Sequence, residues 1–161
     1  MWLWQKNPYR GSWFVYKKVF LEEIKEEVGS TLREGQQLIV NCEFKKQEFV
    51  SDARILRNIL FNLITNASKY SDVNKPINIR CYESKGSVSF EVRDEGIGIP
   101  EEDHRHMFDR FFRASNAGNV QGTGLGLNIV KRYLDLLEGS ITFTSKYAEG
   151  TTFYVTIPVR K

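Results

Sequence analysis

The sequence predicts an α+β domain, a two-layer α/β sandwich in which helices cover one face of a mixed, mainly antiparallel sheet. Three observations carry this prediction. Apolar residues recur at helical spacing in three segments, strand-like runs lie between those segments, and four of the strands fall into two hairpins. The length of 161 residues suits a single domain with its own core.

The spacing of apolar residues predicts the first two helices. One amphipathic helix is expected over residues 15–32, and a longer one from the capping residues Ser51 and Asp52 to about Tyr70. The apolar positions that share one face are Val19, Phe20, Ile24 and Val28 in the first helix, and Ile55, Leu56, Ile59, Leu60, Leu63 and Ala67 in the second.

The rest of the domain reads as strands, one helix and one short helical piece. A third helix is expected over residues 125–137, with Glu138-Gly139 as its C-terminal cap. A short helical piece is expected around residues 103–112. The predicted strands are residues 37–44, 77–83, 88–94, 140–145 and 151–158, with turns at 84–87 and 146–150.

Composition excludes several classes of protein. The net charge of +3 comes from 23 basic against 20 acidic residues, which is too small an excess to indicate a nucleic-acid binder. No apolar run approaches the roughly 18 residues of a membrane span, because Asn62 ends the best candidate. We also expect no secretory leader. We therefore expect one cytoplasmic domain that itself contacts neither nucleic acid nor membrane.

Two features receive no functional role. Residues 1–14 hold all three tryptophans without regular periodicity, and we treat them as an N-terminal arm or an expression remnant, with the domain at 15–161. Cys42 and Cys81 lie among strand-like residues without metal-binding or CxxC spacing. We expect them to be reduced thiols.

The polar residues of the second predicted helix gather beside its apolar face. Asn62, Asn66, Lys69 and Tyr70 are spaced by four, three and one, although asparagine is a poor helix former. An amide oxygen suits Mg²⁺, a lysine reaches phosphate oxygens and a tyrosine ring can cover a base. The alternative is an ordinary solvated helix face.

Two glycine-containing runs follow. In the first, DEGIGI, Asp94 ends a strand, and its carboxylate suits an exocyclic amino group such as that of adenine. The second, GTGLGL at residues 122–127, opens a helix, where free backbone N–H groups and the helix dipole favour a phosphate. It matches neither a P-loop nor a Rossmann pattern. The alternative is a flexible loop before a helix.

Residues 100–121, which we call the lid, are too many for an idle connection. Phe108, Phe111 and Phe112 alternate there with charged residues, and Arg113 offers a fork for phosphate oxygens. His104 and His106 lack the sequence context of a phosphoacceptor, and we expect them to be surface residues. The phenylalanines alone are equally compatible with an ordinary core.

Together these motifs resemble the catalytic, ATP-binding domain of bacterial sensor histidine kinases, within the wider family of gyrase, Hsp90 and MutL ATPases. NLITNASKY is similar to the asparagine box, DEGIGI and GTGLGL to the glycine boxes, MFDRFFR to the phenylalanine box, and EGTTFYVTIP to the closing strand. The match covers about residues 15–160. It implies the Bergerat ATP-binding fold, with ATP and Mg²⁺ as ligands.

The resemblance also implies roles for individual residues. Asn66 would bind Mg²⁺, Lys69 and Arg113 would contact phosphate, and Asp94 would bind the adenine amino group, with Thr151 helping through water. Gly96 and Gly98 would hinge the lid, and Phe108 and Phe111 would anchor it. The full nucleotide-binding set is Asn62, Asn66, Lys69, Tyr70, Asp94, Gly96, Gly98, Ile99, Arg113, Gly122, Thr123, Gly124, Leu125, Gly126, Leu127 and Thr151.

One residue selects among the branches of this family. Hydrolytic members carry a glutamate four residues before the metal-binding asparagine, where it orients water as a general base. Asn62 occupies that place. The sequence therefore favours transfer of the γ-phosphoryl to a histidine on a separate domain, and indirectly to a response regulator. The alternatives are an ATP-hydrolysing clamp of the gyrase or MutL type and a non-catalytic nucleotide sensor.

Overall fold

The computed structural model describes residues 13–44, 48–84 and 86–159. Its elements follow the chain in the order β1 (Trp13–Tyr16), α1 (Lys17–Gly29), β2 (Leu38–Glu43), β3 (Glu48–Ser51), α2 (Ala53–Tyr70), β4 (Ile77–Ser84), β5 (Ser87–Arg93), η1 (Glu101–His106), η2 (Ser115–Ala117), α3 (Gly126–Leu136), β6 (Ser140–Lys146) and β7 (Gly150–Pro158).

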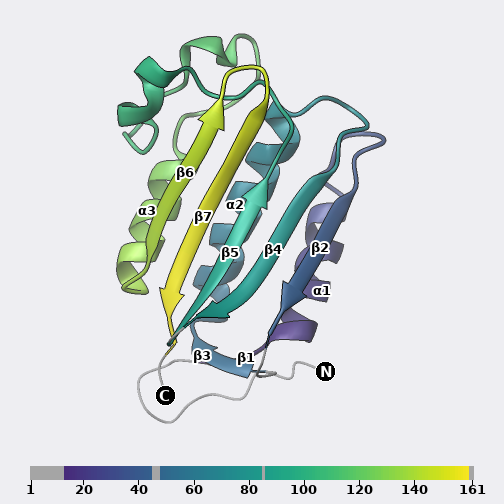
Figure 1. The fold of residues 1–161 in the computed structure, drawn as a ribbon, viewed down its shortest axis with the longest axis vertical. Helices are drawn as coiled ribbons and strands as arrows, with labels where there is room; N and C mark the ends of the chain where they lie inside the picture. Colours follow the sequence, from purple (N-terminus) through teal and green to yellow (C-terminus); the bar gives the residue numbers. More distant parts are fainter. Residues whose placement is uncertain (1–12, 45–47, 85, 160–161) are drawn as a thin grey trace.

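The structure confirms the predicted α+β sandwich. Five strands form one sheet in the order β2-β4-β5-β7-β6, in which only the β2–β4 pair is parallel. The helices α1, α2 and α3 lie along one face of this sheet, and the opposite face is open (Figure 1). The two predicted hairpins are present, as β4–β5 and β6–β7.

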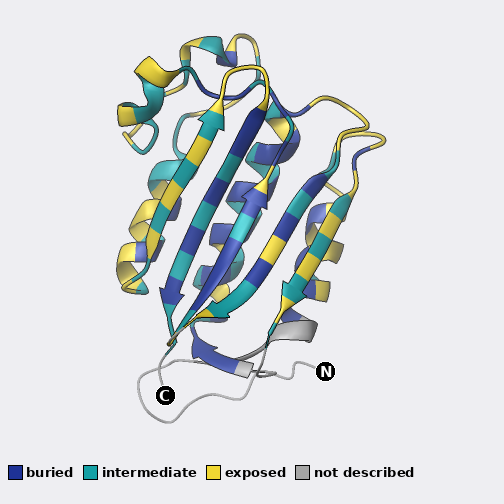
Figure 2. Ribbon diagram, viewed as in Figure 1, coloured by how far each residue is buried: buried dark blue, intermediate teal, exposed yellow. Residues whose placement is uncertain are grey.

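The core lies between the sheet and the helices. The predicted apolar stripe of α2 is at its centre, because Leu56, Ile59, Leu60 and Leu63 are all fully buried. β4 and β7 bury roughly alternate residues and β5 buries residues 88–90 in succession. The edge strands β2 and β6 are more exposed (Figure 2). None of the helices in the described ranges combines the length and the apolar composition needed to cross a bilayer.

Both ends of α2 are fixed by side chains. At the N-terminus, the predicted cap Asp52 accepts hydrogen bonds from the backbone of Arg54 and Ile55. At the C-terminus, the buried Gln36 Nε2 donates to the carbonyls of Ser68 and Asp72, at 3.1 Å each. Since the last carbonyls of a helix lack intrahelical partners, Gln36 holds the helix end that carries Lys69 and Tyr70.

The cap at the end of α3 is where the sequence places it, but with different chemistry. Glu138 takes the left-handed conformation (φ 57°), and the N–H of Gly139 donates to the Leu134 carbonyl at 2.8 Å. This is a Schellman motif in which glutamate occupies the position that favours glycine. The described helix ends at Leu136, one residue before the prediction.

The N-terminal part of the described chain differs from expectation. The predicted first helix begins at Lys17, because residues 13–16 form β1 and pair with β3 in a separate two-stranded sheet. Residues 13–16 (WFVY) are aromatic or β-branched, which favours a strand. Residues 1–12 lie outside the described residues, so the N-terminal arm stays a prediction.

The expectation of reduced cysteines is wrong in this structure. Cys42 and Cys81 form a disulfide across the parallel pair β2–β4. The register sets the two residues directly opposite each other, with their Cα atoms 4.4 Å apart. A separation of 39 residues in the chain gives no hint of this register, which is why sequence spacing could not reveal the pair.

The lid is less helical than predicted. Instead of one helical piece over residues 103–112, it contains the short 3₁₀ helices η1 and η2 joined by turns. The carboxylate of Asp103 accepts hydrogen bonds from both the N–H and the hydroxyl of Ser115, which links the two 3₁₀ helices. These bonds lower the pKa of Asp103 below its usual value.

Candidate functional site

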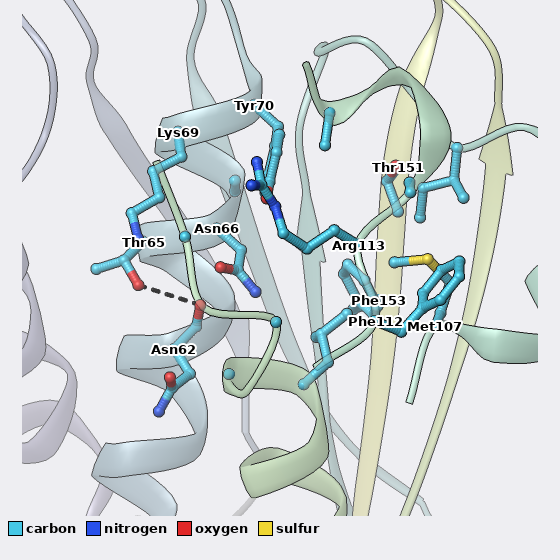
Figure 3. A pocket seen from close by; sticks show the side chains of 18 of the residues that line it. Asn62, Thr65, Asn66, Lys69, Tyr70, Met107, Phe112, Arg113, Thr151 and Phe153 are labelled. Carbon is cyan, nitrogen blue, oxygen red and sulfur yellow. Dashed lines mark hydrogen bonds between the residues drawn. The ribbon is translucent and has the colours of Figure 1, made fainter. Parts of the chain in front are cut away.

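A cavity of about 310 Å³ opens between α2, the N-terminus of α3, the lid and the end of the sheet. It gathers almost the whole predicted set from segments far apart in the chain. The predicted residues that line it are Asn62, Asn66, Lys69, Tyr70, Asp94, Gly98, Ile99, Arg113, Gly122, Thr123, Gly124, Leu125, Gly126, Leu127 and Thr151. Figure 3 shows α2 on one side and Thr151, Phe153 and Met107 on the other.

The α2 wall supplies amides and a cation. Asn62 and Asn66 lie one helical turn apart, so both face the cavity. The Asn62 amide donates to the Asn58 carbonyl at 2.8 Å, whereas the Asn66 side chain makes no hydrogen bond with the described residues. Asn66 therefore presents a free amide oxygen, which is a suitable ligand for Mg²⁺.

Asp94 is a buried carboxylate at the end of β5. Its Oδ1 accepts hydrogen bonds from the N–H of Gly96 at 2.9 Å and of Thr151 at 3.2 Å. Among the described residues no group donates a hydrogen bond to Oδ2, so this oxygen can accept one from a ligand. Burial raises the pKa of Asp94 to about 6, against the lowering effect of the two backbone hydrogen bonds.

The α3 side of the cavity is lined by backbone. The helix begins at Gly126 without a side-chain cap, so its first N–H groups are available to a ligand. A Cβ atom at Gly126 would lie 3.3 Å from Asn62 Oδ1 and 3.7 Å from Asn66 Nδ2. Glycine keeps the space between these amides and the helix end open, where an anion would meet the positive end of the dipole.

Two of the glycines are required by backbone conformation. Gly98 (φ 63°) packs against the turn between β6 and β7, where a Cβ would lie 2.0 Å from the Lys146 carbonyl oxygen. Gly124 (φ 70°) packs against the lid, where a Cβ would lie 2.6 Å from the Phe112 carbonyl oxygen. Both glycines thus allow close backbone contacts at the rim of the cavity.

The lid residues are placed differently from one another. Phe108 packs on the core and contacts the ring of Phe143, as an anchor should. Phe111 is 63 % exposed in a left-handed conformation, so the prediction that it anchors the lid is wrong. Phe112, one residue on, lines the cavity instead.

Arg113 lines the cavity and is also exposed. Its Nη2 donates to the carbonyls of Gly118 and Val120, so its guanidinium binds the lid itself in this structure. In Figure 3 its side chain extends toward the side of the cavity that α2 forms. Both contacts use Nη2, so the N–H groups of Nη1 and Nε make no hydrogen bond with the described residues and could bind a phosphate.

Gly96 is the one predicted site residue that does not line this cavity. It acts on the site indirectly, through the hydrogen bond from its N–H to Asp94 and an isolated bridge to Ser71.

The expectation of surface histidines also needs correction for His104. Its ring packs edge-on against Phe143 and its Nε2 lies 3.0 Å from the Ile99 carbonyl oxygen, so it supports the base of the lid.

Sequence reasoning missed several lining residues. These are mainly apolar or small, namely Thr65, Ala67, Ile97, Met107, Phe112, Ala114, Asn116, Ala117, Ile129 and Phe153. Phe153 could have been found, because strand alternation puts it on the same face as Thr151. Asn116 could not, because only the folded lid brings its Nδ2 to 2.9 Å from the Gly98 carbonyl oxygen. Within the described ranges no cluster of three or more His, Cys, Asp or Glu side chains could hold a metal.

Comparisons with known proteins agree with this geometry. A family model described as histidine kinase-, DNA gyrase B-, and HSP90-like ATPase matches residues 51–161. The heme sensor protein HssS of Staphylococcus haemolyticus is 37% identical over 125 residues, which cover 78% of this chain and 27% of that protein. The sensor histidine kinase YkoH of Bacillus subtilis is 37% identical over 139 residues, which cover 84% of this chain and 30% of that protein.

The solved structures include a mycobacterial sensor histidine kinase, MprB, with a TM-score of 0.77 and 25% sequence identity over 91% of this chain and 97% of that one. This chain spans less than a third of the length of the two curated relatives. It belongs to the histidine kinase-, DNA gyrase B- and HSP90-like ATPase family, and within it to the ATP-binding catalytic domains of sensor histidine kinases.

Proposed function

We propose that this domain binds Mg-ATP and donates the γ-phosphoryl group to a histidine on a phosphoacceptor domain outside residues 1–161. One observation carries the choice of transfer over hydrolysis. Asn62 lies on the cavity wall one turn before Asn66, where a water-activating carboxylate would be needed. An amide has no basic lone pair at neutral pH, so it cannot take a proton from water.

The polar groups of the cavity fit an adenine base. Asp94 Oδ2 would accept from the exocyclic amino group, with the phenol of Tyr70 and the side chains of Ile99 and Phe153 around the ring. Guanine carries a carbonyl oxygen at the same place, which would face the carboxylate without a proton between them. Asp94 therefore supports selection of adenine over guanine.

The residues on the other side fit phosphates and a hard cation. Asn66 would supply an oxygen ligand to Mg²⁺, since its amide makes no hydrogen bond with the described residues. Lys69 would bind phosphate oxygens, as would the uncapped N–H groups of α3 from Gly126 onward. When bound, Mg²⁺ would neutralise part of the negative charge of the ATP phosphates, and ATP would supply the γ-phosphoryl group.

Catalysis by this chain would consist of positioning and charge stabilisation. The side chains of Asn66 and Lys69 hold the phosphate end and Asp94 holds the base. The N–H groups of Arg113 that its lid contacts leave free would bind the γ-phosphoryl oxygens. The acceptor imidazole nitrogen forms the new bond to phosphorus as the bond to the ADP oxygen breaks. The imidazole proton passes to a base on the acceptor domain, since Asn62 cannot take it.

The partners and the location follow from the same proposal. The acceptor histidine belongs to the parent protein or to a second chain, and a response regulator then receives the phosphoryl group. We place the domain in the cytoplasm, as part of a membrane-anchored sensor.

The direct test is incubation with γ-labelled ATP and a histidine-hairpin acceptor domain. Acid-labile phosphohistidine should form on the acceptor, and Asn66→Ala should abolish it. Nucleotide binding without any phosphohistidine would contradict transfer. Steady release of inorganic phosphate by the chain alone, lost in Asn66→Ala, would instead support a hydrolysing clamp. Binding without either product would leave a nucleotide sensor as the function.

A further inference from the structure

The hydroxyl of Ser145, at the end of β6, lies directly behind the base-binding side of the cavity. It accepts a hydrogen bond from the N–H of Ile99 at 2.8 Å. It lies 2.8 Å from Thr151 Oγ1 and 3.1 Å from the Gly150 carbonyl oxygen. Thr151 lines the cavity and Ser145 does not, so Ser145 acts on the cavity only through its neighbours.

The number of protons in this cluster limits its states to two. Ser145 has one hydroxyl proton, and one of its lone pairs is taken by Ile99. If the proton goes to Gly150, Thr151 must donate to Ser145 and can only accept from the cavity. If it goes to Thr151, the proton of Thr151 is free to point into the cavity.

An adenine base would select the second state. A base with its amino group on Asp94 and its N1 edge toward β7 would bring N1 to the part of the wall formed by Thr151, whose N–H also bonds Asp94. N1 is an acceptor, so Thr151 must donate to it, directly or through one water. A hydroxyl that itself accepts a hydrogen bond is a stronger donor, because the two bonds polarise each other.

We propose that Ser145 is a positioning residue for base recognition, whose hydroxyl donates to Thr151 and so directs the Thr151 proton toward N1 of adenine. The same hydroxyl fixes Ile99, at the base of the lid, through the N–H it accepts. This inference rests on the proposed binding of adenine at Asp94. What it adds is that the contribution of Thr151 to base binding depends on Ser145, a residue outside the cavity.

The test compares the affinities for ADP and for 1-deaza-ADP, in which a C–H group replaces N1. The full chain should prefer ADP by about fivefold, the size of one ordinary hydrogen bond. In Ser145→Ala the preference should fall below about twofold, because the Thr151 hydroxyl then loses the donated hydrogen bond that orients and polarises it. A purely structural loss would weaken both ligands equally and leave the ratio unchanged, which would overturn the inference.

The matched control is Thr144→Ala, on the same strand but exposed and bonded to Tyr154 on the open face of the sheet. It should keep the wild-type ratio. If Ser145→Ala fails to fold, Ser145→Cys keeps the size with a weaker donor, and its ratio should lie between those of wild type and no preference. A wild type that binds ADP without preference also overturns the inference, whereas a wild type that binds no ADP overturns the proposed function itself.

Discussion

Asp94 Oδ1 accepts a hydrogen bond from the backbone N–H of Thr151, 57 residues further along the chain, at 3.2 Å. The bond joins the end of β5 to the start of β7 and fixes the carboxylate at the cavity wall. Burial nevertheless raises the pKa of Asp94 to about 6. At neutral pH the group is therefore mostly ionised, and a modest fall in pH protonates it.

The affinity for ADP should consequently depend on pH through Asp94. If only the carboxylate form accepts from the adenine amino group, the dissociation constant at pH 5.5 should be about four times that at pH 7.5. Titration calorimetry on wild type and Asp94→Asn would measure this. The phosphates titrate equally in both proteins, so a pH dependence that remains unchanged in Asp94→Asn would exclude Asp94 as its source.

The same carboxylate should destabilise the ligand-free fold at neutral pH. Its pKa is higher in the folded chain than the value of 3.8 in the unfolded chain, so the folded state binds the proton more tightly. The resulting stability is present below pH 4 and is lost as pH rises through 6, by about 3 kcal/mol. Asp94→Asn should therefore raise the free energy of unfolding at pH 7.5, as measured by denaturant titration. A variant that is less stable than wild type at that pH would contradict this.

The dependence of ATP binding on magnesium should reside in Asn66. Added Mg²⁺ should lower the dissociation constant for ATP in wild type. In Asn66→Ala the factor by which it does so should be at least ten times smaller, because one oxygen ligand is missing. Asn58→Ala is the matched control, on the same helix, exposed and outside the cavity. Equal magnesium dependence in Asn66→Ala and Asn58→Ala would rule out Asn66 as a ligand.

The cap of α3 predicts a stabilising substitution. Glu138 adopts φ 57° at the position of a Schellman motif where glycine is least strained. Glu138→Gly should raise the free energy of unfolding by about 0.5–1 kcal/mol. This is the left-handed strain of about 1–2 kcal/mol, less the roughly 0.5–1 kcal/mol that the greater freedom of glycine in the unfolded chain costs. Chemical denaturation checks this, with Gly139→Ala as the opposite case, since a Cβ there would lie 2.7 Å from the Thr156 carbonyl oxygen. A loss of stability in Glu138→Gly would show that the glutamate side chain contributes more than its backbone strain costs.

Local patterns were sufficient for most of the fold. The apolar stripe of α2 and its cap at Asp52 depend on residues within a few positions, and both are present as predicted. The short ribbon of β1 and β3 was missed, because four-residue strands carry little periodicity. The Cys42–Cys81 pair was also missed, since it depends on the register between distant strands.

The lining of the cavity was predictable where a residue is unusual for its local structure. Asn66, Asp94 and Gly126 all line the cavity, and each stands out in the sequence against local propensity or at the end of an element. Contacts made by the folded lid were not predictable. Phe111 and Phe112 are equivalent in the sequence pattern. In the structure, Phe111 itself has a left-handed backbone and its side chain is exposed, whereas Phe112 lines the cavity.

The most direct measurement is a thermal or chemical unfolding curve of the chain with Mg-ADP, set against the same curve with Mg-GDP. At 100 times its dissociation constant, ADP should add about 2.7 kcal/mol to the free energy of unfolding, and GDP at the same concentration should add little. Asp94→Asn should lose most of that difference. Equal stabilisation by ADP and GDP in the wild type, or none by either, would contradict an adenine site at Asp94.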